Sequence, residues 1–216
     1  MLARGPACTG PTLPLASGEE GTANEGSERW STFLVHARAL EHARRSIAGV
    51  GGDQWGSSSD CEAWTVRELV NHIVTGNYWA AELAAGLSIE DVGDRLDGDV
   101  LGTDPLRAYD DSSMVAAAAF RAAGAMEAPC AVSYGPVPGE VYCGHRFVDV
   151  LIHGWDVASS TGQDTTLDPE LVEACFEVIE PQLDMLVGSG MFGTRLDVPD
   201  GAGRQTELLA VLGRRG

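Results

Sequence analysis

Positive charge is scarce in this sequence, and the scarcity disfavours several classes of partner. The 216 residues include 14 Lys and Arg against 32 Asp and Glu, a formal net charge of -18. Such a chain repels phosphate backbones and anionic membrane surfaces, so we expect neither a nucleic-acid nor a membrane partner. Apolar runs of roughly 18 residues are also missing, so the sequence predicts no membrane-spanning helix and a cytoplasmic location.

Paired cysteines and several familiar motifs are missing too. The five cysteines are an odd number at wide spacings without a CxxC pair. That pattern disfavours a disulfide framework and a structural zinc knuckle, and it favours reduced thiols. No GxSxG elbow, P-loop or GxGxxG fingerprint occurs. Cys143 lies close before His145, so a Cys–His nucleophile stays open at this point.

Length and apolar content suit one folded domain. Apolar residues make up 44% of the chain, which is enough to build a core without disulfides. Residues 1–28 are rich in Gly, Pro, Thr and Ser and lack a continuous apolar stretch. We therefore expect a disordered N-terminal tail rather than a signal peptide, followed by one domain over residues 29–216.

Apolar residues at helical spacing predict a series of helices after the tail. The first begins at Arg29 and is broken by GGDQW. The second follows a capping box formed by Thr65 and Glu68, and it can run to about Leu87.

Loops and proline punctuate the next part of the chain. The acidic stretch SIEDVGDRLDGDVLGTD is expected to be mostly loop. Asp104 and Pro105 then supply the N-cap and first turn of a third helix. Pro and Gly interrupt short apolar pieces over residues 125–143, which predicts a loop with a short hairpin.

Further helices complete the pattern. A fourth spans about residues 145–160, and a fifth starts after Asp168-Pro169 and should be kinked or divided by Pro181. The string TELLAVLGRRG predicts a short terminal helix. The sequence therefore predicts an all-α protein: a four-helix bundle with a long connection between the third and fourth core helices.

The stretch DVLIHGWD, residues 149–156, is the chemically unusual part of the fourth helix. Asp149 and His153 are one turn apart and project from one face, which Asp156 shares. A carboxylate and an imidazole among apolar residues suit zinc, iron, nickel or manganese. A surface ion pair or a capped core histidine would give the same spacing, so both interpretations stay open.

His72, in ELVNHIV on the second helix, is the candidate third ligand. It lies inside an apolar stripe, where a polar ring is unusual unless it has a binding partner. With Asp149 and His153 it would form a two-histidine, one-carboxylate set with open positions, as catalytic metal sites have. His36 and His42, among arginines on the first helix, are expected to be solvated.

Three strings carry a resemblance to a known family: CEAWTVRELVNHIV, RFVDVLIHGWDVASSTGQD and ELLAVLGR. From about Trp30 to Arg214 the chain resembles actinobacterial metal-binding proteins related to mycothiol-dependent maleylpyruvate isomerase, within the DinB-like superfamily. The resemblance implies a DinB-like four-helix bundle that holds a divalent metal, usually zinc, on His72, Asp149 and His153. The isomerase carries Glu where Asp149 stands, so the shorter side chain must reach the metal differently.

The resemblance also implies a function of the mycothiol-dependent isomerase or S-transferase type. A divalent metal, zinc or else nickel, iron or manganese, would activate the thiol of mycothiol for attack on a small electrophile. Asp156 and His145 are candidates to orient ligands or to move protons. Arg146 is a candidate to hold a substrate carboxylate, although a plain surface arginine would fit the same position. Relatives of this shape often pair, so a homodimer is an open option.

Two other functions stay open beside the thiol-using enzyme. One is a non-catalytic metal- or small-molecule-binding protein of sequestration or resistance. The other is a thiol-independent Lewis-acid enzyme of secondary metabolism. The three hypotheses predict, in turn, thiol-dependent turnover, tight binding without turnover, and metal-dependent turnover without a thiol.

Overall fold

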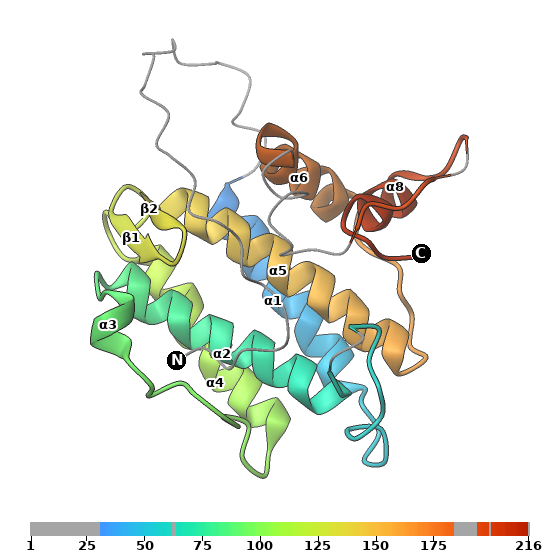
Figure 1. Cartoon of the computed structure of the whole chain (residues 1–216), viewed down its shortest axis with the longest axis horizontal. Helices are drawn as coiled ribbons and strands as arrows, with labels where there is room; N and C mark the ends of the chain where they lie inside the picture. Colours follow the sequence, from blue (N-terminus) through green and yellow to red (C-terminus); the bar gives the residue numbers. More distant parts are fainter. Residues whose placement is uncertain (1–30, 62–63, 184–193, 199, 216) are drawn as a thin grey trace.

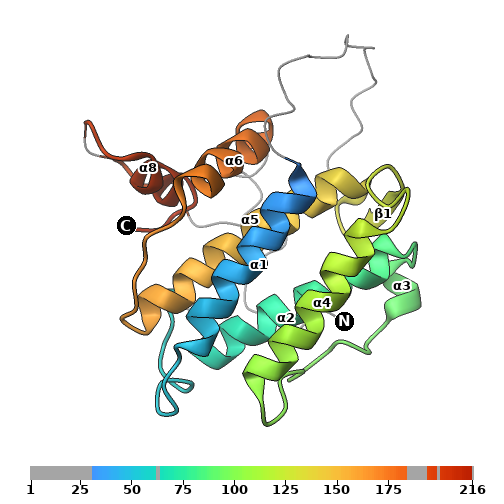
Figure 2. The same ribbon diagram turned by 180° about the vertical axis from the view of Figure 1, so that it is seen from behind.

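Four helices build the core of the protein in the computed structural model, which describes residues 31–61, 64–183, 194–198 and 200–215. They are α1 (Thr32–Ala48), α2 (Val66–Ala84), α4 (Pro105–Arg121) and α5 (Gly139–Ser160). Helix α1 packs against α5 and α4, and α2 packs against the same two helices, so the four close into a ring (Figures 1 and 2). The predicted four-helix bundle is confirmed. The predicted tail lies outside the described residues.

Short elements connect and flank the bundle. Helix α3 (Ile89–Val92) lies between α2 and α4, and strands β1 (Pro129–Val132) and β2 (Gly135–Pro138) form an antiparallel hairpin in the long connection between α4 and α5. After α5 come α6 (Pro169–Ile179), the 3-10 turn η1 (Glu180–Gln182) and α8 (Arg204–Val211). Helix α6 contacts both α1 and α5, and α8 packs on α6 (Figure 1). None of the described helices is both long and apolar enough to cross a bilayer.

The predicted helix starts are confirmed by their caps. The Thr65 hydroxyl accepts a hydrogen bond from the backbone N–H of Glu68, whose carboxylate accepts the N–H of Thr65 in return. The carboxylates of Asp104 and Asp168 cap α4 and α6 by accepting the backbone N–H of Arg107 and of Glu170. These side chains satisfy amides that have no partner within the helix, which is why the starts could be located from sequence.

Two boundaries differ from the sequence prediction. Residues 139–143 were expected to be loop, but they form the first turns of α5. At position 139 a Cβ would collide with the carbonyl oxygen of Ala125, which accounts for the glycine. This glycine therefore does not end a helix. Within the acidic stretch, which was predicted to be mostly loop, Ser88 and Asp91 form a capping box that supports the short helix α3.

The expectation that His36 and His42 are solvated is wrong. His36 is fully buried on α1, with its ring edge-on to Phe120 at a centroid distance of 5.3 Å. Burial, reinforced by the charge of Arg146, lowers the pKa of His36 to about 3, so the ring is neutral. Helix α1 packs against both α4 and α5, so a large part of its circumference is buried. Arginines next to a histidine in the sequence therefore do not show that the histidine is exposed.

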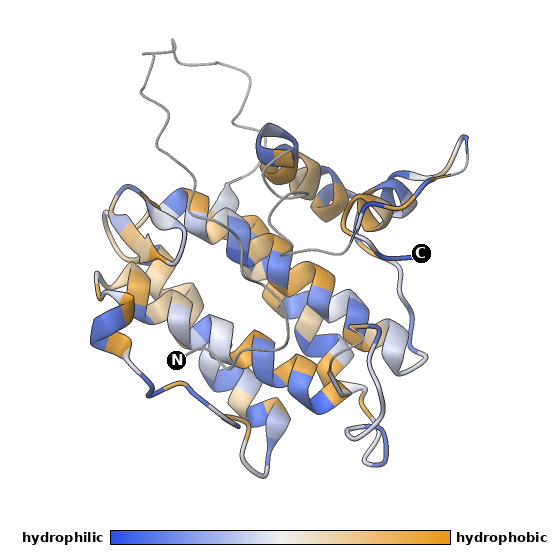
Figure 3. Ribbon diagram, viewed as in Figure 1, coloured by the Kyte–Doolittle hydropathy of each residue, from blue (hydrophilic) through white to orange (hydrophobic). Residues whose placement is uncertain are grey.

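Apolar side chains from all four core helices meet in one cluster that includes Val70, Ile73, Phe147 and Leu151. Figure 3 shows that apolar and polar positions alternate along the core helices, and in α1, α2 and α4 the buried residues recur at helical spacing on one face. Helix α5 is the exception, since it is buried on most of its circumference. A polar residue on α5 is therefore enclosed by protein unless a cavity opens beside it.

The glycine of the HGWD string, Gly154, allows two helices to pack closely. Gly154 lies where α5 crosses α1, and a Cβ there would be 2.9 Å from both Cα and Cβ of Ala43. The string TGQD serves the same junction, because Gln163 donates a hydrogen bond at 2.9 Å to the carbonyl of Ser46 near the end of α1. Part of the family-like string therefore holds two helices together.

Gly154→Ala is expected to destabilise the protein by about 1–3 kcal/mol, because the new methyl group must force α1 and α5 apart. Gly144→Ala on the same helix is the matched control, since its Cβ would meet Val178 at an ordinary 3.4 Å. The control should gain about 0.5–1 kcal/mol from helix propensity. Urea unfolding measures both, and equal stabilities would contradict the close packing.

Candidate functional site

A cavity of about 1200 Å³ lies beside α5. Its wall includes His72 and Gly76 of α2, residues of α5, Tyr134 from the hairpin turn, and Arg214 after α8. On α5 three polar residues one turn apart face it, namely His145, Asp149 and His153. The cavity explains why DVLIHGWD carries polar residues within an otherwise buried helix.

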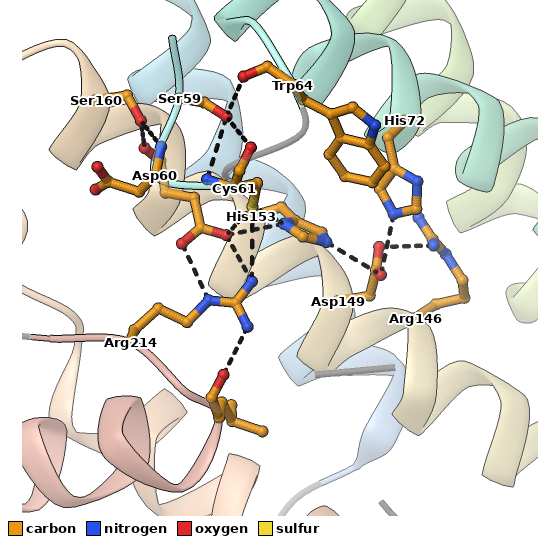
Figure 4. A network of polar contacts seen from close by, with 12 residues as sticks. Ser59, Asp60, Cys61, Trp64, His72, Arg146, Asp149, His153, Ser160 and Arg214 are labelled. Carbon is orange, nitrogen blue, oxygen red and sulfur yellow. Dashed lines mark hydrogen bonds and ion pairs between the residues drawn. The ribbon is translucent and has the colours of Figure 1, made fainter. Parts of the chain in front are cut away.

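The structure brings together the three residues predicted as metal ligands, His72, Asp149 and His153 (Figure 4). Nε2 of His72 lies 3.3 Å from Oδ1 of Asp149, and Nε2 of His153 lies 3.6 Å from the same oxygen. One donor atom from each of the three residues lies within 4.8 Å of the others. These residues are called the trio below.

Asp149 has its second oxygen occupied by Arg146. Nη1 of Arg146 donates to Oδ2 at 2.8 Å, while Nη2 donates to the amide oxygen of Asn77 at 3.3 Å. Arg146 is only 7% exposed, so it approaches the trio from the protein interior. Gly76 makes room for it, because a Cβ there would lie 2.6 Å from Cζ of Arg146.

His153 is held by Asp156 on its other side. Nδ1 of His153 lies 2.9 Å from Oδ2 of Asp156, which has no exposed surface. Arg214 donates to both oxygens of Asp156, at 3.2 Å from Nε and 2.9 Å from Nη2 (Figure 4). With Nδ1–H donated to a carboxylate, Nε2 of His153 faces Asp149, an orientation typical of metal-binding histidines.

His72 is held by an aromatic ring. The indole of Trp64 stacks on its imidazole, with ring centroids 4.8 Å apart and planes inclined by 29°. The rings of His72 and His153 meet edge-on at 4.9 Å. Each of the three side chains in the trio therefore has its own neighbour that fixes its orientation.

Charge and burial act in opposite directions on the trio. Burial raises the pKa of Asp149, but Arg146 and the two imidazoles outweigh it and hold that pKa well below its usual range. Burial lowers the pKa of His153, but the carboxylates of Asp149 and Asp156 raise it to about 10. Burial lowers the pKa of His72. A proton on His153 therefore competes with any cation for the same nitrogen.

A second group with metal-binding side chains lies next to the trio and is less suited to a cation. It consists of Cys61, His153 and Asp156. The Cys61 thiol donates to Oδ2 of Asp156 at 3.3 Å, and Nη2 of Arg214 lies 3.8 Å from the sulfur. Because Arg214 binds both oxygens of Asp156, whereas Arg146 binds only one oxygen of Asp149, the trio is the better place for a metal ion.

His145 lies on the same face of α5 but has other partners. Its Nδ1 is 2.5 Å from the hydroxyl of Tyr134, and its Nε2 is 3.0 Å from Oε1 of Gln182. Cys143 has no exposed surface, and burial raises the pKa of its thiol to about 12. A thiol in that state is a poor nucleophile, which argues against the Cys143–His145 alternative.

Several residues of the site were not assigned a role from the sequence. They come from segments distant in the chain: Cys61 and Trp64 before α2, Tyr134 in the hairpin turn, and Arg214 after α8. Cys61, Trp64 and Arg214 do belong to the strings that carry the family resemblance. Their place in these strings could have marked them as functional residues. The strings do not indicate, however, which side chains they contact.

Comparison with known proteins places the chain in a family. Residues 36–158, which run from α1 into α5 and contain the trio, match the family described as mycothiol maleylpyruvate isomerase N-terminal domain. The chain belongs to this family. The resemblance noted from the three strings is thereby confirmed, whereas Arg214 lies beyond the matched residues.

Several known proteins are similar to this chain. Two uncharacterized proteins of Mycobacterium tuberculosis, MT0763 and Rv0738, are each 40% identical over 139 residues, which cover 64% of this chain and 72% of theirs. The crystal structure of the mycothiol-dependent maleylpyruvate isomerase superposes with a TM-score of 0.58 at 17% identity. It covers 70% of this chain and 68% of that one, and a mutant of the isomerase gives a TM-score of 0.57. At this identity the match confirms the DinB-like fold.

Gly76→Ala is expected to push Arg146 away from Asp149. The loss of stability should be roughly 1–3 kcal/mol, because a partly buried carboxylate loses a charged partner. Urea unfolding measures the effect, with Gly144→Ala again as the control that adds a methyl group without a collision. A Gly76→Ala protein as stable as the control would show that the Arg146 contact does not hold Asp149.

Proposed function

We propose that this protein is a divalent-metal-dependent enzyme of the mycothiol-dependent isomerase or S-transferase type. The observation that supports this most directly is the convergence of one oxygen of Asp149 and the Nε2 atoms of His72 and His153 on one point of the cavity wall. The thiol of a low-molecular-weight cofactor would add to a small electrophile. Release of the thiol would complete an isomerisation, and its retention would complete an S-transfer.

The donor set of the trio fits a divalent cation. Two imidazole nitrogens and one carboxylate oxygen suit zinc, nickel, iron or manganese, and three protein ligands leave positions for other molecules. We take zinc as the first candidate. A cation held there would lower the pKa of a thiol and so favour the thiolate at neutral pH.

The residues around the trio would keep its donor atoms in place. Asp156, clamped by Arg214, orients His153, and Arg146 fixes the carboxylate of Asp149. We therefore assign Asp156 and Arg146 positioning roles, since Nη1 and Nη2 of Arg146 donate to Asp149 and Asn77. Supporting contacts of this kind commonly change metal affinity by about 10- to 100-fold when removed.

The cavity is large enough for two reactants. Pockets for single ligands commonly enclose about 300–1000 Å³, and this one encloses about 1200 Å³. Trp64, Trp79 and Tyr142 give it an aromatic wall, while Arg214 and Arg215 contribute positive charge. A polar thiol cofactor and a small anionic electrophile would both find complementary surfaces there.

Metal content is the first test of this proposal. The purified protein should carry about one divalent ion per chain, and the His72→Ala/His153→Ala double variant should lose it while staying folded. His145→Gln, on the same face of α5 but outside the trio, is the matched control and should keep the metal. Mass spectrometry measures the content. If added zinc, nickel, iron and manganese neither bind nor raise the melting temperature, the proposal is wrong.

Thiol dependence is the second test. With mycothiol and the fluorogenic electrophile monochlorobimane, the metal-loaded protein should give saturable turnover that disappears after chelation, because the thiolate fraction falls. Fluorescence measures the rate. Tight binding of a small molecule without turnover would indicate the sequestering protein instead. Metal-dependent turnover of another substrate without thiol would indicate the Lewis-acid enzyme.

A further inference from the structure

A second polar cluster lines the cavity beside the trio, and the proposed function leaves it without a role. It consists of Tyr134 at the turn of the β1–β2 hairpin, His145 on α5 and Gln182 in η1. All three residues line the cavity. His145 precedes Asp149 by one turn on the same face of α5, a rise of about 6 Å along the helix axis. The cluster is therefore within reach of a ligand that lies against the trio.

The hydrogen-bond directions in this cluster are determined by Gln182. Its side-chain N–H donates to the carbonyl of Val178 at 2.9 Å, so its Oε1 faces His145 as an acceptor. Nε2 of His145 must then carry the hydrogen and donate it to Oε1. Nδ1 is left as the bare nitrogen, and it accepts the hydroxyl of Tyr134 at 2.5 Å.

The protonation states agree with these directions. Burial lowers the pKa of His145, although the bond to Gln182 opposes this, so the ring is neutral at neutral pH. Partial burial raises the pKa of Tyr134 to about 12, so the phenol keeps its proton. The charge of Arg146 acts in the opposite sense on Tyr134, which means that the guanidinium next to Asp149 is close enough to influence the phenol.

We propose that Tyr134 and His145 form a proton-transfer pair, in which the phenol touches the ligand and His145 accepts the proton through it. This role rests on the proposed function. Tyr134 lines the cavity and is 49% exposed as a residue, although its hydroxyl is bonded to His145, so its side chain can contact a ligand there. A tyrosine that served only to fasten the hairpin would not need that access.

The proton balance of the step is complete. As the S–H bond of the thiol breaks, its proton joins the oxygen of Tyr134, and the original phenol proton moves to Nδ1 of His145. The sulfur forms a bond to the electrophilic carbon, and the electron pair displaced from that carbon resides on the adduct as a carbanion or leaves with a departing group. In an isomerisation the C–S bond of the adduct breaks, the electron pair of the carbanion re-forms the double bond, and the pair returns the proton to the released sulfur. In an S-transfer the departing group leaves with the electron pair, and His145 loses its proton to water. No oxidant or reductant is needed.

The first readout concerns the resting pair and needs no substrate. Nitrogen-15 NMR of histidine-labelled full-length protein should show His145 with hydrogen on Nε2 and a bare Nδ1, assigned by comparison with His145→Gln. Hydrogen on Nδ1 would overturn the proposal, because the ring could then not accept the phenol proton.

The second readout is steady-state kinetics of the zinc-loaded protein with mycothiol and monochlorobimane. Tyr134→Phe and His145→Gln should each lower kcat by about 100-fold, within the range for general acid–base groups. The KM for mycothiol should change less than about threefold, because the pair acts on the transition state. Val132→Ala is the matched control: it loosens the buried packing of the same hairpin but leaves the phenol in place, and its kcat should stay near that of the wild type.

Each other result counts against the pair. Equal kcat values in all four proteins would show that Tyr134 and His145 do not transfer the proton, while the proposed thiol-using function would still hold. Equal losses in Tyr134→Phe and Val132→Ala would show that Tyr134 only fastens the hairpin. If the wild-type protein shows no thiol-dependent turnover, the proposed function is wrong. The role proposed for Tyr134 and His145 is then wrong as well, whatever the variants do.

Discussion

The contact between Arg146 and Asp149 is the interaction on which the candidate site depends. A carboxylate on a largely buried helix is costly unless a charged partner compensates it. Arg146 does so from inside the bundle, at 2.8 Å, along a path that exists because residue 76 is glycine. Arg146 binds Oδ2 of Asp149, so Oδ1 is free to face the imidazoles of His72 and His153.

Helix α5 organises the site because its polar residues recur at one-turn intervals. His145, Asp149 and His153 follow one another along the cavity, and Asp156 continues the row behind His153. Each has a partner from another part of the chain: the hairpin turn, α2, or the segment after α8. The residues matched by the family model include this row and its partners from the hairpin turn and α2, whereas Arg214 follows them in the chain.

The sequence was sufficient to predict the bundle and most helix starts, because these depend on short-range patterns. His72, 77 residues from Asp149, was predicted instead from its place in an apolar stripe and from the family resemblance. Helical spacing brings Asp149 and His153 to one face, and caps such as Thr65 with Glu68 act within four residues. What could not be predicted depends on contacts between distant segments. Burial of His36 follows from the packing of α1 against two helices. The position of Tyr134 beside His145 depends on how the hairpin folds back, and Gly139 resembles a helix breaker until the nearby carbonyl of Ala125 is known.

The clamp formed by Arg214 also has a consequence for the order in which the site is made during synthesis. Arg214 follows its partner Asp156 by 58 residues. Because the ribosome releases the chain from its N-terminus, all four core helices emerge before this arginine does. A nascent bundle can therefore bury its apolar faces while Asp156 still lacks its cationic partner. Orientation of His153 is then one of the last features of the fold to be secured, which separates the acquisition of structure from the acquisition of a competent site.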